Sequence, residues 1–115
     1  MARFEILLTE QAEVDLNAIS DTRTATAIEK RIDKLEGDAL ALGKELQGDL
    51  NGYYSVRAAG QRYRIVYQVA LIEATESSAP PDSPDPDGLV TVLVIGIRKE
   101  GDKRDVYRVA SKRLG

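Results

Sequence analysis

Apolar and polar residues alternate with a period of two in the segment 52–69, which reads GYYSVRAAGQRYRIVYQV. Side chains of a strand point alternately to opposite faces, so each half of this segment has one apolar face and one polar face. Gly60 tolerates a positive φ and lies between the two halves, where a turn is expected. The segment therefore predicts a β-hairpin with one face for a core and one for charged groups. In the second half, the apolar face comprises Tyr63, Ile65, Tyr67 and Val69, and the polar face comprises Arg62, Arg64 and Gln68.

Two segments before this hairpin have apolar residues at helical spacing. Thr9 is a good N-cap for the first segment, and acidic residues follow it in the first turn. A break at Ser20-Asp21-Thr22 supplies a cap for the second segment, which ends at Gly43. A coiled-coil arm is an alternative for it, but the spacing lasts barely three heptads. We expect an antiparallel helical hairpin that covers a sheet, with the second apolar stripe formed by Ala25, Ile28, Ile32, Leu35, Ala39 and Leu42.

The remaining segments complete an α+β fold. Arg3–Leu8 is expected to be a short strand, and Leu89–Ile97 a strand that is buried on both faces or central in the sheet. Residues 73–88 contain all four prolines and no basic residue, which predicts an acidic loop inserted at a hairpin tip. Asp102 is expected to cap a last helix. The sequence thus predicts one α+β domain over residues 1–115, with the helical hairpin packed on a small antiparallel β-sheet and a C-terminal helix.

The composition excludes several kinds of chemistry. The chain has no cysteine and no histidine, so disulfides, thiolate ligands and histidine acid–base catalysis are excluded. We expect no metal and no cofactor. No stretch approaches the about 20 apolar residues of a membrane-spanning helix. We therefore expect a cytoplasmic protein that does not bind membranes.

Charge is distributed unevenly along the chain, whose formal net charge is −3. Residues 1–52 and 73–88 are acidic, whereas 53–72 and 89–115 are basic. An acidic chain does not attract nucleic acid through its overall charge, but the two basic segments predict a local surface that binds phosphate.

Three residues of the basic segments are candidates for phosphate chemistry. Arg64 lies on the polar side of a strand, Arg98 ends the next strand, and Tyr107 follows in the last helix. Adjacent strands and a helix that folds back would bring them together. Guanidinium groups bind phosphate oxygens, and nearby cations favour the phenolate form of tyrosine. The alternative is that the arginines form a solvated or ion-paired face and that Tyr107 lies in the core. Further candidates for binding phosphate or RNA are Arg57, Arg62 and Lys99.

Four segments carry motifs that are informative together: KELQGDLNGYYSVR (44–57), RYRIVYQV (62–69), VIGIRKE (94–100) and DVY (105–107). Together they resemble the RelE/ParE toxin superfamily of bacterial type II toxin–antitoxin systems. The resemblance implies a small α+β fold with an N-terminal helical hairpin, in agreement with the element order above. It also implies a cognate antitoxin as partner, and contact with DNA only through the toxin–antitoxin complex.

The RelE branch of this superfamily consists of ribosome-dependent mRNA endonucleases. The toxin enters the ribosomal A site, where the 2′-hydroxyl of the mRNA attacks the adjacent phosphate and translation stops. By this resemblance Arg64 would stabilise the phosphorane, Arg98 would bind or protonate the leaving oxygen, and Tyr107 would orient or deprotonate the 2′-hydroxyl. Arg57 stands where that branch has a lysine.

Ser55 is a departure from the RelE branch, because it stands where a second lysine is expected. With no histidine partner, it is also a weak candidate for a nucleophile. The departure leaves open the ParE branch, which poisons DNA gyrase and does not cleave RNA. A binding module that acts only through its antitoxin is a third possibility. The combination of Arg64, Arg98 and Tyr107 favours the endoribonuclease.

Overall fold

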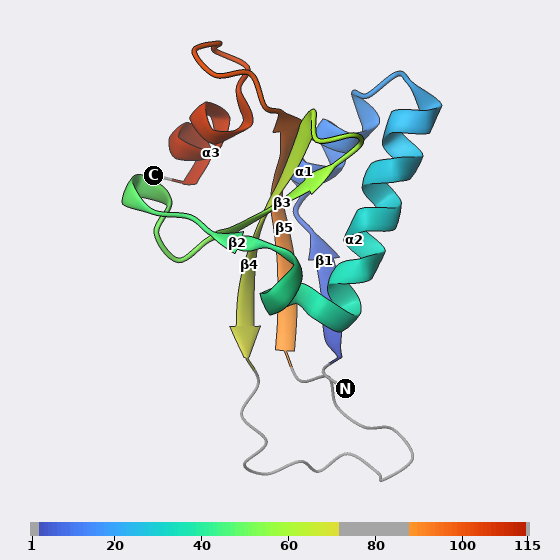
Figure 1. The fold of residues 1–115 in the computed structure, drawn as a ribbon, viewed down its shortest axis with the longest axis vertical. Coiled ribbons are helices and arrows are strands. Elements are labelled where there is room, and N and C mark those ends of the chain that lie inside the picture. Colours follow the sequence, from blue (N-terminus) through green and yellow to red (C-terminus); the bar gives the residue numbers. More distant parts are fainter. Residues whose placement is uncertain (1–2, 72–87, 115) are drawn as a thin grey trace, which may run out of the picture.

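The computed structural model describes residues 3–71 and 88–114, so all of the expected acidic loop at 73–88 except Gly88 lies outside the described residues. Within these ranges the five strands form one sheet, in the order β1-β5-β4-β3-β2, and three helices and a short 3-10 turn accompany it (Figure 1). The α+β class is confirmed. The elements are β1 (Phe4–Leu8), α1 (Glu10–Asn17), α2 (Thr22–Leu42), β2 (Lys44–Glu45), η1 (Gly48–Leu50), β3 (Tyr54–Ala58), β4 (Tyr63–Leu71), β5 (Gly88–Ile97) and α3 (Val106–Leu114).

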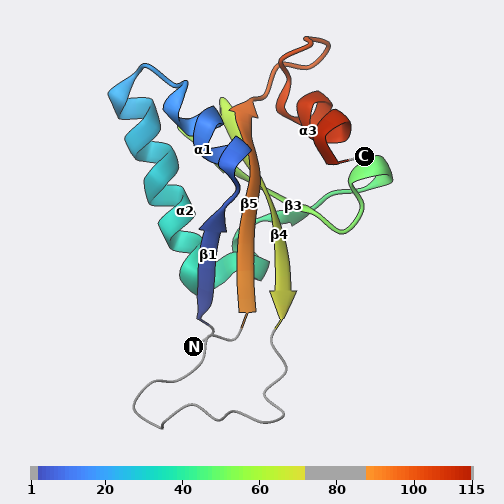
Figure 2. The same cartoon turned by 180° about the vertical axis from the view of Figure 1, so that it is seen from behind.

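The sheet is mixed, so the prediction of an antiparallel sheet is wrong. β1 pairs parallel with β5, from Phe4 opposite Gly88 to Leu8 opposite Val92, whereas the other neighbouring strands are antiparallel. β1 and β5 run in the same direction (Figure 2), because α2 returns the chain along the sheet and the steps from β2 to β3, from β3 to β4 and from β4 to β5 each reverse it once more. The alternation of residues defines the faces of a strand but not the direction of its neighbour.

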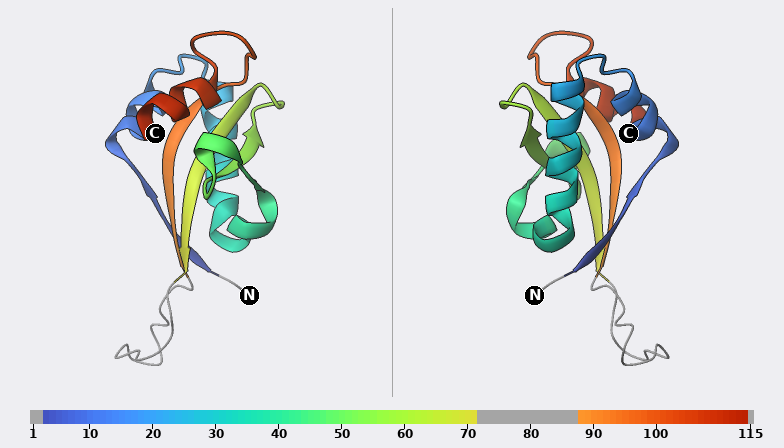
Figure 3. Two further views of the ribbon diagram at one scale, coloured as in Figure 1. Left: turned by 90° about the vertical axis from the view of Figure 1, so that its left-hand side faces the viewer. Right: turned by 90° about the vertical axis from the view of Figure 1, so that its right-hand side faces the viewer.

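β4 and β5 are the longest strands and run side by side (Figure 3). Their pairing extends from Tyr63 opposite Ile97 to Leu71 opposite Gly88, with a register shift between Val66 and Tyr67. β5 also pairs with β1 on its other side, so the expectation of an inner position for this segment is confirmed.

Buried side chains form a cluster on each face of the sheet. Ile65 and Tyr67 of β4 belong to one cluster and Val66 to the other, since consecutive side chains of a strand point to opposite faces. Residues of α1 and α2 complete the first cluster, and residues of α3 complete the second. The predicted apolar face of the hairpin is confirmed, and α3 covers part of its polar face. The second cluster comprises Leu50, Val66, Val94, Val106 and Ala110.

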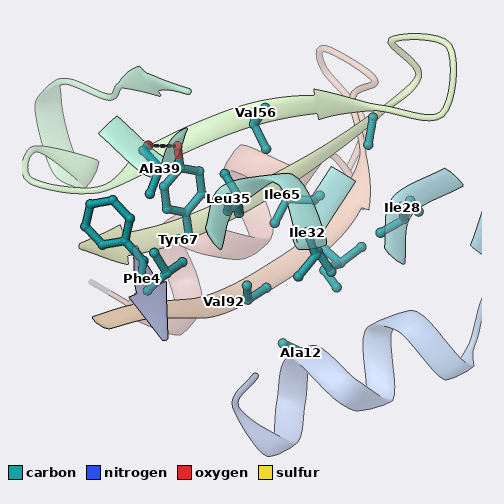
Figure 4. Packing of buried hydrophobic residues seen from close by; sticks show 13 residues of the cluster. Phe4, Ala12, Ile28, Ile32, Leu35, Ala39, Val56, Ile65, Tyr67 and Val92 are labelled. Carbon is teal, nitrogen blue, oxygen red and sulfur yellow. Dashed lines mark hydrogen bonds between the residues drawn. The ribbon is translucent and has the colours of Figure 1, made fainter. Parts of the chain in front are cut away.

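Tyr67 belongs to the first cluster, where it lies near Ala39 and Phe4, and is fully buried (Figure 4). Its hydroxyl donates a hydrogen bond of 2.6 Å to the carbonyl of Ala39, in the last turn of α2. A Cβ atom at Gly43 would overlap this hydroxyl. Gly43 ends α2 as predicted, and the close approach of Tyr67 explains why this position has no side chain.

The predicted starts of the first two helices are confirmed, because Thr9 and Asp21 cap α1 and α2. α1 contacts β5 and β1, and α2 contacts β1, β4, β3 and β5. Each helix therefore packs on the sheet, and the expected antiparallel packing of the two helices on each other is not confirmed.

Candidate functional site

Arg98 and Tyr107 are in contact on the α3 side of the sheet. The Cζ atom of Arg98 lies 4.8 Å from the centroid of the Tyr107 ring, which is the arrangement of a cation–π interaction. The backbone N–H of Arg98 donates to the carbonyl of Arg62 at 2.7 Å, so the pairing of β5 continues beside the turn of the hairpin. The structure thus brings together two of the three residues that the sequence suggested for catalysis.

The carboxylate of Asp105 holds this pair in place. Its Oδ1 atom accepts from Nη1 of Arg98 at 2.7 Å and from the backbone N–H of Lys99 at 2.6 Å. Its Oδ2 atom accepts from the backbone N–H of Tyr107 at 3.2 Å. Burial disfavours the charged carboxylate, but Arg98 and these N–H groups outweigh burial, and the pKa of Asp105 lies below its ordinary value. The same hydrogen bond raises the pKa of Arg98, so both groups are charged at neutral pH.

Sequence reasoning missed the role of Asp105. It expected Asp102 to cap the last helix, but α3 begins at Val106, and the Asp105 carboxylate accepts the N–H of the second helical residue. Asp102 instead accepts from the backbone N–H of Arg104 at 2.8 Å. This hydrogen bond is the main reason why the pKa of Asp102 is lowered to about 2. The signal in the sequence was an aspartate directly before an apolar helical stretch.

Ser55 also contacts Tyr107. The two hydroxyl oxygens are 2.9 Å apart. Ser55 is 6% exposed and lies in β3 opposite Val66, so its side chain shares the face on which α3 packs. The serine that departs from the RelE pattern therefore has a partner, on a helix that follows 52 residues later in the chain.

Arg64 lies on the same face, but its guanidinium turns back toward the hairpin. Nη1 of Arg64 donates to the carbonyl of Tyr63 at 3.2 Å and also to the carbonyl of Gln61. Arg57, directly opposite Arg64, donates to the side chain of Gln61 at 3.4 Å. The two arginines brace a turn in which residues 59–61 all have positive φ. In the described ranges, no hydrogen bond or ring contact joins Arg64 to the other two candidates.

Arg62 and Lys99 lie at the same end of the sheet and are exposed. The carbonyl of Arg62 binds the end of β5, and Nζ of Lys99 is 3.5 Å from a carboxylate oxygen of Asp102. The cations around this end of the sheet are called the basic surface below. The basic surface comprises Arg57, Arg62, Arg64, Arg98 and Lys99.

A second ion pair fixes α3 against the rest of the molecule. Nη1 and Nη2 of Arg113 contact the two carboxylate oxygens of Asp15 in α1 at 2.8 and 3.2 Å. Arg113 also donates to the carbonyl of Leu93, and Asp15 accepts the N–H of Ile95. These bonds occupy the edge of β5 where β1 has ended. The pair thereby positions the helix that carries Tyr107.

Residues 3–71 and 88–114 contain neither a cluster of metal-binding side chains nor a helix that could cross a membrane. No group of three or more histidine, cysteine, aspartate or glutamate side chains there could hold a metal ion. No helix in those ranges is long and apolar enough to cross a membrane.

The fold belongs to a class already known from toxin–antitoxin proteins. Over 82% of this chain, the structure is similar to 96% of a chain in the crystal structure of the toxin–antitoxin complex RelBE2 from Mycobacterium tuberculosis, with a TM-score of 0.60 and 22% sequence identity. No protein-family model and no curated protein matches the sequence. The likeness shows that this chain shares its fold with a chain of that complex.

Proposed function

We propose that this protein is the toxin of a type II toxin–antitoxin system and acts as a ribosome-dependent mRNA endonuclease. The similarity of its fold to a chain of the RelBE2 complex supports a toxin with a cognate antitoxin. The observation that carries the enzymatic part is the contact of Arg98 with Tyr107, anchored by Asp105 beside the other cations of the basic surface. Ribosome and mRNA are the further partners, and DNA is contacted only through the antitoxin complex.

In the proposed reaction, the 2′-oxygen of a nucleotide forms a bond to the adjacent phosphorus, and the bond from phosphorus to the 5′-oxygen of the next nucleotide breaks. The 2′-hydroxyl loses its proton and the departing 5′-oxygen gains one, leaving a 2′,3′-cyclic phosphate and a 5′-hydroxyl. Negative charge accumulates on the phosphorane oxygens. A guanidinium that is already oriented stabilises this charge without a cost of reorganisation. Arg98 meets that requirement, because Asp105 fixes its orientation.

Arg64 is the second guanidinium for the phosphorane. Its present acceptors are neutral carbonyls of the turn. A phosphate oxygen is a stronger acceptor than a neutral carbonyl, because the hydrogen bond is charge-assisted. When mRNA binds, Arg64 would therefore release the carbonyls of the turn and donate its hydrogen bonds to a phosphate of the mRNA. Arg57, Arg62 and Lys99 would hold the neighbouring phosphates.

The test is to map the 5′ ends of cellular RNA shortly after the protein is induced. We expect new ends within codons of translated messages, together with arrest of translation. Arg98→Gln and Tyr107→Phe should abolish both effects, whereas Lys34→Gln, which removes an exposed charge on α2, should leave them unchanged. Intact messages during growth arrest would refute the nuclease.

A gyrase poison of the ParE type is the second candidate, and Ser55 in place of a lysine is the observation that favours it. It predicts a DNA-damage response and stalled gyrase cleavage complexes while messages remain intact. The same induction experiment, followed by a supercoiling assay with purified gyrase, separates the two functions.

A further inference from the structure

Tyr107 is held at three points, two on its side chain and one on its backbone. Its hydroxyl bonds Ser55 at 2.9 Å, the face of its ring meets Arg98, and its backbone N–H donates to Asp105. Ser55 is itself fixed, because β3 pairs on both sides at this residue, with Lys44 and with Val66. The hydroxyl of Tyr107 makes one hydrogen bond in this arrangement, to Ser55, and can make a further one.

The direction of the bond between Ser55 and Tyr107 decides what the phenol can bind. Each hydroxyl has one proton to donate. If Tyr107 donates to Ser55, only its oxygen lone pairs are available to RNA, and it can accept from a 2′-hydroxyl. If Ser55 donates, the phenol proton is also available, and it can bind an acceptor of the RNA. The non-bridging oxygens of a phosphodiester are acceptors without protons.

Arg98 decides which group of the RNA comes close to the phenol. Its Cζ atom lies 4.8 Å from the centroid of the Tyr107 ring. A phosphate bound by this guanidinium therefore comes close to the phenol. The non-bridging oxygens of that phosphate can only accept hydrogen bonds, so the phenol meets them with its own proton.

We propose that Ser55 is a positioning residue that donates to the oxygen of Tyr107, so that Tyr107 donates its proton to a non-bridging phosphate oxygen of the RNA. This inference rests on the proposed nuclease function. The chain of bonds then runs in one direction, from Ser55 through Tyr107 to the phosphate, and each bond polarises the next. Tyr107 is a phosphate ligand in this arrangement and takes no proton from the 2′-hydroxyl.

The test uses ribosomes programmed with an mRNA that carries a 2′-deoxynucleotide at the position of cleavage. This mRNA keeps the phosphate but has no nucleophile, so binding is measured without reaction. Loss of a hydrogen bond to a charged acceptor should weaken binding about 10- to 100-fold in Tyr107→Phe. Ser55→Ala should weaken it by a smaller factor in the same direction, and Ser55→Thr, which keeps a hydroxyl, should restore it.

A double variant separates positioning from simple damage to the fold. If Ser55 acts only through the phenol, Ser55→Ala should have no further effect in the Tyr107→Phe background, and independent effects that multiply would overturn the inference. It would also be overturned if both single variants bound the deoxy mRNA like the wild type but failed to cut the ribose form. Wild-type protein that neither binds programmed ribosomes nor cuts mRNA would refute the nuclease itself, and the role of Ser55 with it.

Discussion

Replacing Asp105 by asparagine tests the anchor of the candidate site. The change keeps the size of the side chain and removes its charge. The carboxylate accepts from three donors, two on Oδ1 and one on Oδ2. An amide has only one oxygen, so if it keeps the two bonds of Oδ1, its NH2 group faces the backbone N–H of Tyr107. The variant therefore loses at least one hydrogen bond and the whole ion pair.

The expected loss of stability follows from the burial of the two partners. Removing one member of a buried ion pair costs about 3–5 kcal/mol, because the other charge is left without a partner. The side chain of Arg98 is 30% exposed, so water can solvate it in part. We therefore expect Asp105→Asn to lower the free energy of unfolding by about 2–4 kcal/mol at pH 7.

The dependence on pH gives the loss a signature. The pKa of Asp105 is lower in the folded protein, so its contribution is present above the unfolded pKa of about 3.9 and disappears as the pH falls through the folded pKa. The difference between wild type and variant should be largest near neutral pH and should shrink below pH of about 4.

The assay is urea unfolding followed by circular dichroism between pH 3 and pH 7. Asp33→Asn, which changes an exposed aspartate of α2, is the matched control and should alter stability by less than about 0.5 kcal/mol. A loss at pH 7 of under about 1 kcal/mol in Asp105→Asn, or a difference that stays constant into acid, would refute the reasoning.

Three further predictions concern the frame of the site. Burial, followed by the nearby Tyr54, raises the pKa of Tyr67 to about 12, so the wild type should lose stability between pH 10 and 12. Tyr67→Phe should cost about 1–3 kcal/mol at pH 7 and remove that alkaline loss; equal alkaline loss in both proteins would contradict this. Arg113→Gln should speed amide hydrogen exchange throughout α3, because it removes the ion pair with Asp15. Lys112→Gln, which changes the exposed neighbouring residue, should not speed exchange. Unchanged exchange in Arg113→Gln would show that the ion pair does not hold the helix. Gly43→Ala should destabilise the protein by more than about 1 kcal/mol, because the new methyl group would meet the Tyr67 hydroxyl. The methyl group of Gly37→Ala would meet nothing, so this control should be neutral or stabilising in thermal unfolding. Equal effects of the two changes would disprove the close approach of Tyr67 to Gly43.

Local patterns predicted the parts of the fold that depend on local physics. Alternation gave the two faces of the hairpin, and the caps at Thr9 and Asp21 lie where the sequence expected them. The parallel pairing of β1 with β5 joins residues at opposite ends of the chain. It depends on the path of α2 between them, which no local pattern contains.

In the candidate site too, the sequence predicted contacts between residues that are close in the chain and missed contacts that depend on the fold. The contact of Arg98 with Tyr107 was foreseen, because a strand end and the following helix are close in sequence. The bond from Ser55 to Tyr107 spans 52 residues, and the orientation of Arg64 depends on carbonyls exposed by one particular turn. Asp102 and Asp105 are both reasonable caps by sequence, and only the packing of α3 on the sheet distinguishes them.

The parallel pairing of β1 with β5 also bears on how the protein is made. In the described sheet the first strand has the penultimate element of the chain as its only neighbour. During synthesis β1 must wait until residue 97 has left the exit tunnel, and closing so large a loop makes folding slow. Arg98, Asp105 and Tyr107 emerge later still. A nascent chain that has emerged only as far as β5 therefore lacks these residues of the candidate site, and so does a product that terminates within β5.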